Sequence, residues 1–513
     1  MRPPRVRFAP SPTGPLHIGG VRTALYNYLL ARRYNGTFIL RIEDTDQARY
    51  VEGAEAYIRE ALVWCGMTPD EGPLAGGEYG PYRQSERSEL YASACATLVE
   101  KGLAYYAFDT TEALTEARSA AEAKGDVFRY GASSRGAMDN SLGLSTKQLR
   151  ERLQNGEPHV IRLLVEPGQE VAFRDRVRGS VRFSTDELDD KVLLKADGMP
   201  TYHLANVVDD HHMEITHVIR GEEWLPSTAH HVLLYEAFDW TAAMPEFAHL
   251  PLILKPEGKG KLSKRDGAKF GMPVFPLEWE DKTSGDTFSG FRESGFLPEA
   301  VVNFLAFLGW NPGTEQELFS LKELVEAFDL EQIGKSGARF DYDKAKWFNQ
   351  QHLGQLSPAE FVRVVEPSLT AAGIETNEAF LMRVAPLMRE RLTSANDLAT
   401  DAHYLFDTPA AFDDKQALKR LGKADLEELS GVSNVLSEAV EWTAPALASA
   451  VKGWAAESGV KLGVLLPLYR IALTGGMSGP DVFELSELLG KEETVARWEQ
   501  AIAHFRILKR TQE

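Results

Sequence analysis

Two short segments of the chain combine residue types that can handle phosphate groups. In the first, His17-Ile18-Gly19-Gly20 stands where a loop rich in proline and glycine meets the start of an amphipathic helix. Backbone N–H groups at a helix start are unpaired and lie at the positive end of its dipole, so we expect a phosphate there, with a hydrogen bond from the His17 ring. Gly19 and Gly20 would let a flat base or a sugar approach the backbone. The alternative is a helix cap with an incidental histidine.

The second segment is Lys261-Leu262-Ser263-Lys264-Arg265, which follows a glycine-containing turn. Its three cations could neutralise the charge that develops on a transferred or departing phosphate. Taken alone, a basic segment of this length is more often a solvated loop. Whether this segment binds phosphate can therefore be judged only together with the other segments.

Two further segments place charged side chains at the ends of predicted strands. Glu43, within Arg41–Asp46, could hold a substrate ammonium group, unless this run only caps the helix that follows. Arg220 ends another strand and could bind a carboxylate in a bidentate pair, unless it forms a surface pair with Glu222 or Glu223. Parallel strands end at the edge of the sheet where ligands bind, so both positions favour a site.

Histidine spacing does not indicate a metal site. The pairs His211-His212 and His230-His231 point apart on a strand and diverge on a helix, and neither has a Cys or Glu partner at ligand spacing. We therefore expect ordinary packed or exposed histidines and no metal ligand in the protein.

The composition is that of a globular protein with several domains. The chain has 513 residues, of which 43% are hydrophobic and 26% charged, and this excludes a collagen-like or disordered chain. It has no run of 18 apolar residues, no apolar signal segment and no pairing pattern for its two cysteines, so we expect a cytoplasmic protein without a membrane span or disulfide scaffold. The formal net charge of −19 argues against indiscriminate binding of nucleic acid. Residues 1–60 and 249–270 are nevertheless net basic, which suits focused binding of phosphates.

The first 60 residues predict the βαβ unit that would position these groups. Residues 5–9 predict a buried strand, apolar residues recur at helical spacing up to about Arg33, and residues 37–42 predict a second strand. A strand, loop, helix and strand in this order form one unit of a doubly wound parallel sheet. The loop that carries His17 then lies at the carboxyl end of a strand, where such sheets bind ligands.

Later segments predict an interruption of this sheet and a helical tail. Strand patterns at 159–165 and 191–196 flank a polar tip, which predicts a domain inserted into the sheet. Alternation of strand and helix then returns at 214–220, 227–238 and 249–254. After about residue 298 the strand patterns fade, so the last third is predicted to be all-helical.

Five segments, taken in their order along the chain, carry a family resemblance. They are RFAPSPTGPLHIGG, RIEDTD, PTYHLANVVDDH, VIRGEEWL and KLSKR. Together they closely resemble the glutamyl-tRNA synthetases of bacteria; HIGG is similar to the HIGH signature of class I aminoacyl-tRNA synthetases, and KLSKR is similar to their KMSKS loop. The resemblance is dense over residues 5–270 and continues near the end of the chain in GVKLGVLLPLYRIALTG.

The resemblance implies a multidomain α/β fold. It consists of a Rossmann-like parallel-sheet catalytic domain, an inserted α+β domain that binds the acceptor end of tRNA, and an all-α C-terminal region that binds the anticodon. The implied boundaries are 1–102 and 201–254 for the halves of the catalytic domain, 103–200 for the inserted domain, 255–340 for a stem-contact region with the KLSKR loop, and 341–513 for the helical region.

The resemblance also implies an activity, the ATP-dependent ligation of L-glutamate to tRNA(Glu). Glutamate and ATP would give glutamyl-adenylate and pyrophosphate, and the 3′-terminal adenosine of the tRNA would then take the glutamyl group; charging of tRNA(Gln) stays open. His17 would contact the phosphates of ATP, and Lys264, with Lys261 as a weaker candidate, would pair with the α-phosphate or the pyrophosphate. The implied ATP site comprises Pro10, His17, Gly19, Gly20, Glu223, Trp224 and Lys264.

The implied glutamate pocket comprises Arg7, Ser11, Glu43, Tyr202, Asn206 and Arg220. Glutamate has two carboxylates and one ammonium, which two arginines and Glu43 match in charge. Which arginine holds the side-chain carboxylate stays open. A buried arginine should reject glutamine, because a neutral amide leaves the cation poorly paired. ATP chemistry implies Mg²⁺, and a monomer is the family expectation.

Two segments depart from the family pattern. Many relatives carry a cysteine-rich zinc site in the inserted domain, but the matching stretch GLAYYAFDTTE has no cysteine, so we expect no structural zinc. The stretch 271–291 is longer than expected, and we interpret it as a surface elaboration, with a tRNA contact as the alternative.

Other functions fit the sequence less well. A nucleotidyl-transferring enzyme of this fold without tRNA, or a short relative that glutamylates a modified tRNA base, would end soon after the sheet, whereas about 170 residues follow Phe340. Intact His17, Glu43, Arg220 and Lys264 argue against a non-enzymatic tRNA-binding paralogue. A glutaminyl enzyme would have a β-rich C-terminal region, whereas the pattern here is helical.

Overall fold

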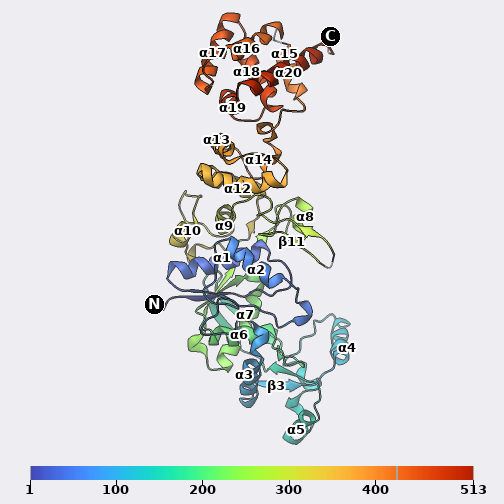
Figure 1. Ribbon diagram of the computed structural model, residues 1–513. Helices are drawn as coiled ribbons and strands as arrows, with labels where there is room; N and C mark the ends of the chain where they lie inside the picture. Colours follow the sequence, from blue (N-terminus) through green and yellow to red (C-terminus); the bar gives the residue numbers. More distant parts are fainter. Residues whose placement is uncertain (1, 283, 423–425, 512–513) are drawn as a thin grey trace. The chain divides into compact units, whose positions relative to one another are not determined.

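A six-stranded sheet organises the N-terminal part of the computed structural model, which describes residues 2–282, 284–422 and 426–511 (Figure 1). The strand order is β2-β1-β8-β9-β5-β6, and all neighbours are parallel except the edge pair β5 and β6. The strands are β1 (Arg5–Phe8), β2 (Thr37–Leu40), β5 (Glu170–Asp175), β6 (Gly179–Ser184), β8 (His217–Gly221) and β9 (Glu246–Leu250). The predicted parallel α/β sheet is thereby confirmed.

The alternation of side chains along β1 decides which helix meets which face of this sheet. Arg7 points to one face, where its guanidinium contacts Asp210 of α6 (Tyr202–His212). Phe8 points to the other face, next to Gly20 of α1 (Ile18–Arg33). Since β1 and β2 are parallel and flank α1, the predicted βαβ unit is present. The turn into β2 requires glycine, because a Cβ on Gly36 would lie 2.0 Å from the carbonyl oxygen of Pro4.

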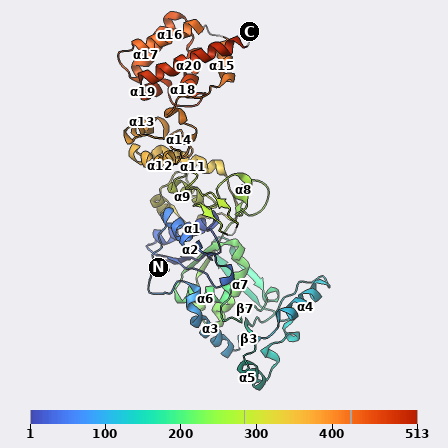
Figure 2. The ribbon, with the colours of Figure 1, turned by 45° about the vertical axis from the view of Figure 1, so that its right-hand side comes forward.

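Further helices of the N-terminal part pack around the main sheet. Among them, α6 lies beside α7 in both views (Figures 1 and 2). These helices are α2 (Ala54–Trp64), α3 (Ser88–Glu100) and α7 (Leu225–Ala237). One apolar cluster joins Ile39 of β2 and Val218 of β8 to Val232 of α7. The apolar helix faces predicted from sequence periodicity therefore bury against the sheet.

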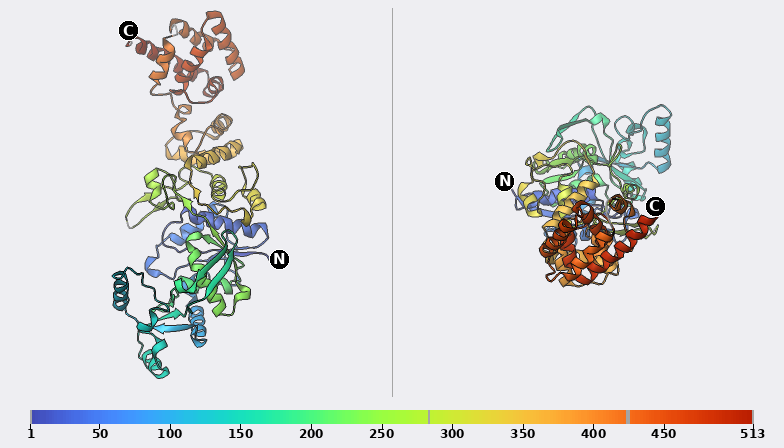
Figure 3. Two further views of the ribbon diagram at one scale, coloured as in Figure 1. Left: turned by 180° about the vertical axis from the view of Figure 1, so that it is seen from behind. Right: turned by 90° about the horizontal axis from the view of Figure 1, so that it is seen from above.

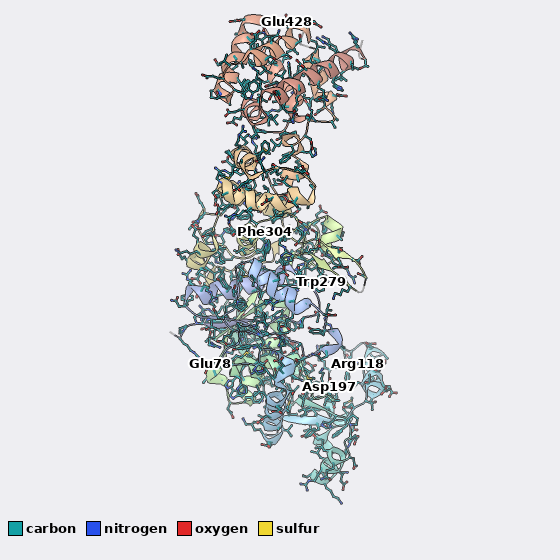
Figure 4. All side chains as sticks on the ribbon, in the orientation of Figure 1. Glu78, Arg118, Asp197, Trp279, Phe304 and Glu428 are labelled. Atoms are coloured by element: carbon teal, nitrogen blue, oxygen red, sulfur yellow. The ribbon has the colours of Figure 1, made fainter. Side chains whose placement is uncertain are left out.

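A second, antiparallel sheet lies within the predicted insertion. Its order is β3 (Ala104–Ala107), β4 (Val160–Leu163) and β7 (Val192–Leu194), and it is accompanied by α4 (Thr111–Glu122) and α5 (Thr146–Gln154). Figure 4 labels Arg118 on α4 and Asp197 in the turn after β7. The range 103–200 also contains β5 and β6, which pair with the main sheet instead. Sequence periodicity identifies a strand but not its sheet, because pairing with β9 is a long-range contact.

The basic segment 261–265 follows β10 (Ile253–Leu254), which pairs with β13 (Ala338–Arg339). Beyond it come α8 (Asp266–Phe270), the hairpin of β11 (Trp279–Glu280) and β12 (Thr287–Phe288), α9 (Pro298–Ala306) and α10 (Leu321–Ala327). Trp279 of the hairpin is labelled in Figure 4. Val274, Phe275 and Leu277 are at most 2% exposed, whereas the described residues of 278–289 are exposed or partly exposed. The stretch 271–291 is therefore a surface segment, as interpreted from the sequence, with a buried apolar anchor that the sequence did not reveal.

The chain forms two compact units by its internal contacts. The first holds residues up to Arg292 and Val301–Tyr342, and the second holds Glu293–Ala300 and the chain from Asp343 on. The helices of the C-terminal part are α11 (Tyr342–Gln355), α12 (Pro358–Ala371), α13 (Glu378–Met388), α14 (Asp397–Thr400), α15 (Asp414–Leu421), α16 (Leu426–Glu438), α17 (Ala444–Ser458), α18 (Leu462–Thr474), α19 (Val482–Leu489) and α20 (Lys491–Arg510).

Within the second unit α18 and α20 pack side by side, at the red end of the colour bar in Figure 3. Leu468 and Trp498 on these helices are fully buried in its apolar core. The described residues after Arg339 contain no strand, so the prediction of an all-α C-terminal region is confirmed. None of the helices in the described parts of the chain combines enough length and apolar character to span a membrane.

Candidate active site

A cleft of about 850 Å³ opens at the carboxyl edge of the main sheet. Loops after β1, β2, β8 and β10 meet there with the start of α6. All of the site residues predicted from the sequence line this cleft: Arg7, Pro10, Ser11, His17, Gly19, Gly20, Glu43, Tyr202, Asn206, Arg220, Glu223, Trp224, Lys261 and Lys264. Because the parallel strands β1, β2 and β8 end together at one edge, the segments that follow them meet there. The segment after β10, about 250 positions from His17, reaches the same cleft from outside the main sheet.

His17 is the N-cap of α1 and is held in one tautomer. Its Nδ1 accepts a hydrogen bond from the backbone N–H of Gly19 at 3.1 Å, so the proton of the neutral ring lies on Nε2. Burial, together with the charges of Lys264 and Lys261, lowers the pKa of His17 to about 4. Nε2 has no hydrogen-bond partner among the described residues. The cleft therefore contains a buried, unpaired N–H donor that suits a phosphate oxygen.

The expectation of free backbone N–H groups at the start of α1 is wrong. The N–H of Ile18 donates to the carbonyl of Val274 at 3.0 Å, and those of Gly20 and Val21 donate to the carbonyl of His17. With the N–H of Gly19 bonded to the ring of His17, the first turn is satisfied within the protein. A segment more than 250 residues away in the sequence supplies part of this cap, so the local sequence could not reveal it.

Lys264 lies against the loop that precedes α1. A Cβ built on Gly14 would be 3.3 Å from the Nζ of Lys264. The basic segment is anchored next to it, because the N–H and Oγ of Ser263 donate to Asp266 at 2.8 and 2.6 Å, and Lys255 pairs with the same carboxylate at 3.0 Å. Burial lowers the pKa of Lys264. An anchored loop thus presents the Lys264 ammonium to the cleft.

Lys261 differs from Lys264 in its partner. Its ammonium forms an ion pair with the carboxylate of Glu223, another predicted ATP-site residue. Both groups belong to the cleft, but each already neutralises the other. Lys264 is therefore the more available cation of the two.

The predicted glutamate pocket rests on charged side chains that pair with one another. Among the described residues these are Arg7, Arg41, Arg87, Asp209 and Asp210, which are buried, and Glu43, whose side chain is 10% exposed. Asp210 accepts hydrogen bonds from Arg7 at 3.0 and 3.2 Å and from Arg41 at 2.7 Å. Against the effect of burial, these two guanidinium groups hold the pKa of Asp210 below its usual value.

Glu43 faces the cleft from this cluster. The amide of Asn206 donates to Glu43 at 2.8 Å, and burial raises the pKa of Glu43 against the opposing charges of Arg41 and Arg7. The neighbouring Asp44 accepts hydrogen bonds from the N–H and Oγ of Ser85, so the alternative of an acidic cap for the next helix is wrong.

Arg220 differs from the paired arginines of this cluster in its hydrogen-bond partners. It is 5% exposed and has no carboxylate partner among the described residues. Its Nε–H donates to His249 at 3.1 Å, and its terminal nitrogens donate to the hydroxyls of Tyr202 at 2.7 Å and Thr228 at 2.8 Å. The alternative of a surface pair with Glu222 or Glu223 is wrong, because these carboxylates pair with Arg178 and Lys261.

Sequence reasoning missed the charged residues beneath the pocket. Arg41, Asp209 and Asp210 stand in the motifs RIEDTD and PTYHLANVVDDH, but nothing in their spacing separates buried from exposed charges. No helical periodicity was available as a signal, because all seven residues from Leu204 to Asp210 of α6 are buried.

In the described residues no group of three or more His, Cys, Asp and Glu side chains is arranged to hold a metal ion. Cys65 and Cys95 are buried free thiols. The buried pair His230 and His231 packs among aromatic rings.

A parallel sheet with a cleft at its carboxyl edge, lined by a buried histidine and a lysine, is typical of Rossmann-like enzymes that bind nucleotides. Comparison of the sequence with known protein families leads to the same class of enzyme. Residues 4–347 match the catalytic domain of the class I tRNA synthetases (E and Q), and residues 360–502 match an anticodon binding domain. The chain therefore belongs to the class I (E and Q) tRNA synthetases, and within them to the glutamate–tRNA ligases.

Relatives and solved structures support this placement over nearly the whole chain. The glutamate–tRNA ligase of Christiangramia forsetii is 52% identical over 97% of this chain and 98% of its own. That of Flavobacterium psychrophilum is 51% identical over 97% and 99%. The crystal structure of a glutamate tRNA ligase from Elizabethkingia meningosepticum in complex with its amino acid has a TM-score of 0.93 at 47% identity, covering 98% of this chain and 99% of that one.

Proposed function

We propose that this cleft activates L-glutamate with ATP and passes it to tRNA(Glu). In the first step an α-carboxylate oxygen of glutamate attacks the α-phosphorus of ATP, and the bond to pyrophosphate breaks. In the second step the terminal ribose hydroxyl of the tRNA attacks the carbonyl carbon of the adenylate, and AMP leaves. No covalent bond to the protein forms, so catalysis depends on positioning and on stabilising charge.

The phosphates of ATP lie between His17 and Lys264 in this proposal. The unpaired Nε2–H of His17 donates to a phosphate oxygen. Before ATP binds the ring is neutral at pH 7, because burial and the charges of Lys264 and Lys261 lower its pKa to about 4. The ammonium of Lys264 offsets negative charge as the bond to pyrophosphate breaks.

Gly19 adjoins the adenosine, and the exposed ring of Trp224 forms part of the rim of the same site. Gly20 does not leave room for a base or a sugar as expected, because a Cβ there would lie 2.5 Å from the side chain of Leu16.

The amino acid lies at the opposite, more buried end of the cleft. Arg220 receives the side-chain carboxylate, since Arg7 is already occupied by Asp210. Glu43 receives the ammonium. The α-carboxylate then points back toward His17 and Lys264, where the α-phosphate must lie.

The observation that carries this proposal is the buried guanidinium of Arg220 without a carboxylate partner among the described residues. The guanidinium groups of Arg7, Arg41 and Arg87 already face carboxylates directly, whereas the guanidinium of Arg220 would still meet a substrate carboxylate. The side-chain carboxylate of glutamate neutralises this guanidinium, whereas the amide of glutamine does not. A buried charge left unpaired costs about 3–5 kcal/mol, so kcat/KM for glutamine should be at least about 10²-fold lower.

The remaining parts supply the tRNA contacts in this proposal. The inserted domain over about 103–200 receives the acceptor end, the region 255–340 contacts the stem, and the helices after 341 bind the anticodon. Mg²⁺, where ATP chemistry requires it, would be bound through the phosphates of ATP and would offset part of their charge. We further propose that the enzyme acts as a monomer in the cytoplasm.

Aminoacylation of purified tRNA(Glu) with glutamate and with glutamine tests the proposal. Native protein should strongly prefer glutamate, and Arg220→Met should lose about 10²-fold in kcat/KM for glutamate while the preference collapses toward unity. Arg182→Met is the matched control, because Arg182 is 69% exposed on β6 and does not line the cleft. An unchanged preference in Arg220→Met would contradict the assignment of Arg220. Charging of tRNA(Glu) and tRNA(Gln) side by side would show whether the second tRNA is also a substrate.

A further inference from the structure

Arg220 is joined to two buried residues that lie outside the cleft. Arg220, His249 and Asp175 stand on three adjacent strands, β8, β9 and β5, near the carboxyl edge of the sheet. Arg220 and His249 are register partners, so their side chains emerge on the same face. His249 and Asp175 are at most 1% exposed, and neither lines the cleft.

Asp175 determines which nitrogen of His249 carries the proton. Its Oδ2 accepts a hydrogen bond from Nδ1 of His249 at 2.6 Å. Its Oδ1 accepts from the backbone N–H groups of Val177 at 2.9 Å, Arg178 at 2.7 Å and His249 at 3.3 Å. An ionised carboxylate only accepts, so Nδ1 must be the protonated nitrogen and Nε2 must present its lone pair.

That lone pair faces Arg220. Nε2 of His249 lies 3.1 Å from Nε of Arg220 and 3.1 Å from the hydroxyl of Thr228. The Nε–H of the guanidinium is therefore bonded away from the cleft, which sets the plane of the group. Its further terminal contacts, to the carbonyl of Trp224 at 3.4 Å and to His231 at 3.5 Å, are long enough to yield to a stronger acceptor.

We infer that Asp175 and His249 are positioning residues for Arg220: the carboxylate holds the imidazole with its lone pair toward Nε–H, and this aims the terminal N–H groups at the substrate carboxylate. The inference rests on the proposed role of Arg220. If Nε2 of His249 carried the proton instead, its N–H would face the Nε–H of Arg220. Two donors would then oppose each other, and the guanidinium would turn away. Burial lowers the pKa of His249 against the opposing effect of Asp175, which keeps the ring neutral in the native state.

Asp175→Asn is the sharpest test because hydrogen bonds from the backbone fix the orientation of the new side-chain amide. Three N–H groups require an oxygen at the Oδ1 position, so the new NH₂ group faces Nδ1 of His249. It donates to Nδ1 and drives the ring proton to Nε2, opposite Arg220. Because a hydrogen bond to a charged group is lost, KM for glutamate should rise about 10- to 100-fold. KM for ATP should stay within about threefold, and the preference for glutamate over glutamine should fall.

Substitutions at His249 separate positioning from packing. His249→Leu should raise KM for glutamate as Asp175→Asn does, whereas His249→Gln keeps an acceptor near Nε2 and should stay within about fivefold of native protein. In the double variant Asp175→Asn/His249→Leu, KM for glutamate should be little higher than in His249→Leu alone. No imidazole remains whose proton Asp175→Asn could move to Nε2. His217→Leu, on the same strand as Arg220 and outside the cleft, is the control.

Initial rates of aminoacylation at saturating tRNA(Glu) give these constants, and thermal unfolding checks that each variant is folded. Equal rises in KM for glutamate and ATP, or additive effects in the double variant, would overturn the inference. If Asp175→Asn does not fold, the comparison of His249→Leu with His249→Gln decides, and equal KM values for these two would overturn it. Should Arg220→Met itself leave KM for glutamate unchanged, the proposed function of Arg220 fails instead.

Discussion

Asp210→Asn would remove one charge from the cluster of paired charges beneath the cleft. This carboxylate accepts hydrogen bonds from Arg7 at 3.0 and 3.2 Å and from Arg41 at 2.7 Å, and the three side chains are at most 3% exposed. Asparagine has nearly the same shape but no charge, so two buried guanidinium groups would lose their shared counter-ion. Breaking a buried ion pair from one side costs about 3–5 kcal/mol.

This cost translates into a measurable shift of the melting temperature. The compact unit that contains Asp210 has about 330 residues, for which the entropy of unfolding is about 0.7 kcal/mol/K near 60 °C. The transition of this unit should therefore fall by about 4–7 °C in calorimetry of the full chain at one scan rate. Asp239→Asn is the control: Asp239 is 84% exposed, and its φ of 62° suits asparagine, so its transition should move by less than about 1 °C.

The effect of Asp210→Asn should also depend on pH. The pKa of Asp210 lies below its usual value because Arg7 and Arg41 outweigh burial. A carboxyl with a lowered folded pKa contributes its full stability above the unfolded pKa, about 3.9, and loses it as the pH falls through the folded pKa. The gap between native protein and variant should thus be constant from pH 7 to 5 and shrink below about pH 4. A gap below about 1 °C at pH 7, or one unchanged between pH 5 and 3, would refute the argument.

Lys264→Ala should lower kcat of ATP–pyrophosphate exchange, measured with tRNA(Glu) present, by about 10²- to 10³-fold while the Kd for the tRNA stays within about threefold; unchanged turnover would remove Lys264 from the mechanism. Because burial lowers the pKa of Lys264, kcat should fall on the alkaline side at a pH below the ordinary value of 10.5, as the ammonium loses its proton. Lys264→Arg should move that limb to higher pH, and a limb that stays in place would belong to another group. Chelation followed by dialysis into Mg²⁺ should restore full activity, and a need for added Zn²⁺ would contradict the prediction of no structural zinc.

Much of the fold follows from patterns between neighbouring residues. Residues 5–42 alternate strand, loop, helix and strand signals, and the structure forms parallel β1 and β2 around α1 from them. The helical tail is equally evident, because apolar periodicity is a local property. Most of the site residues could be named only through the family resemblance of the motif segments. Three of these segments end strands of one parallel sheet and share its carboxyl edge, which explains why they meet.

The chain by itself determined the segments that carry chemistry and the order in which they meet a sheet. Only the tertiary structure decided their states: Val274 caps α1, β5 and β6 join the main sheet, Arg7 is neutralised by Asp210, and Arg220 is not. The physical reason is that the electrostatic state of a buried group depends on which distant charges and hydrogen-bond partners surround it. Those partners are brought by long-range packing, which local sequence patterns do not encode.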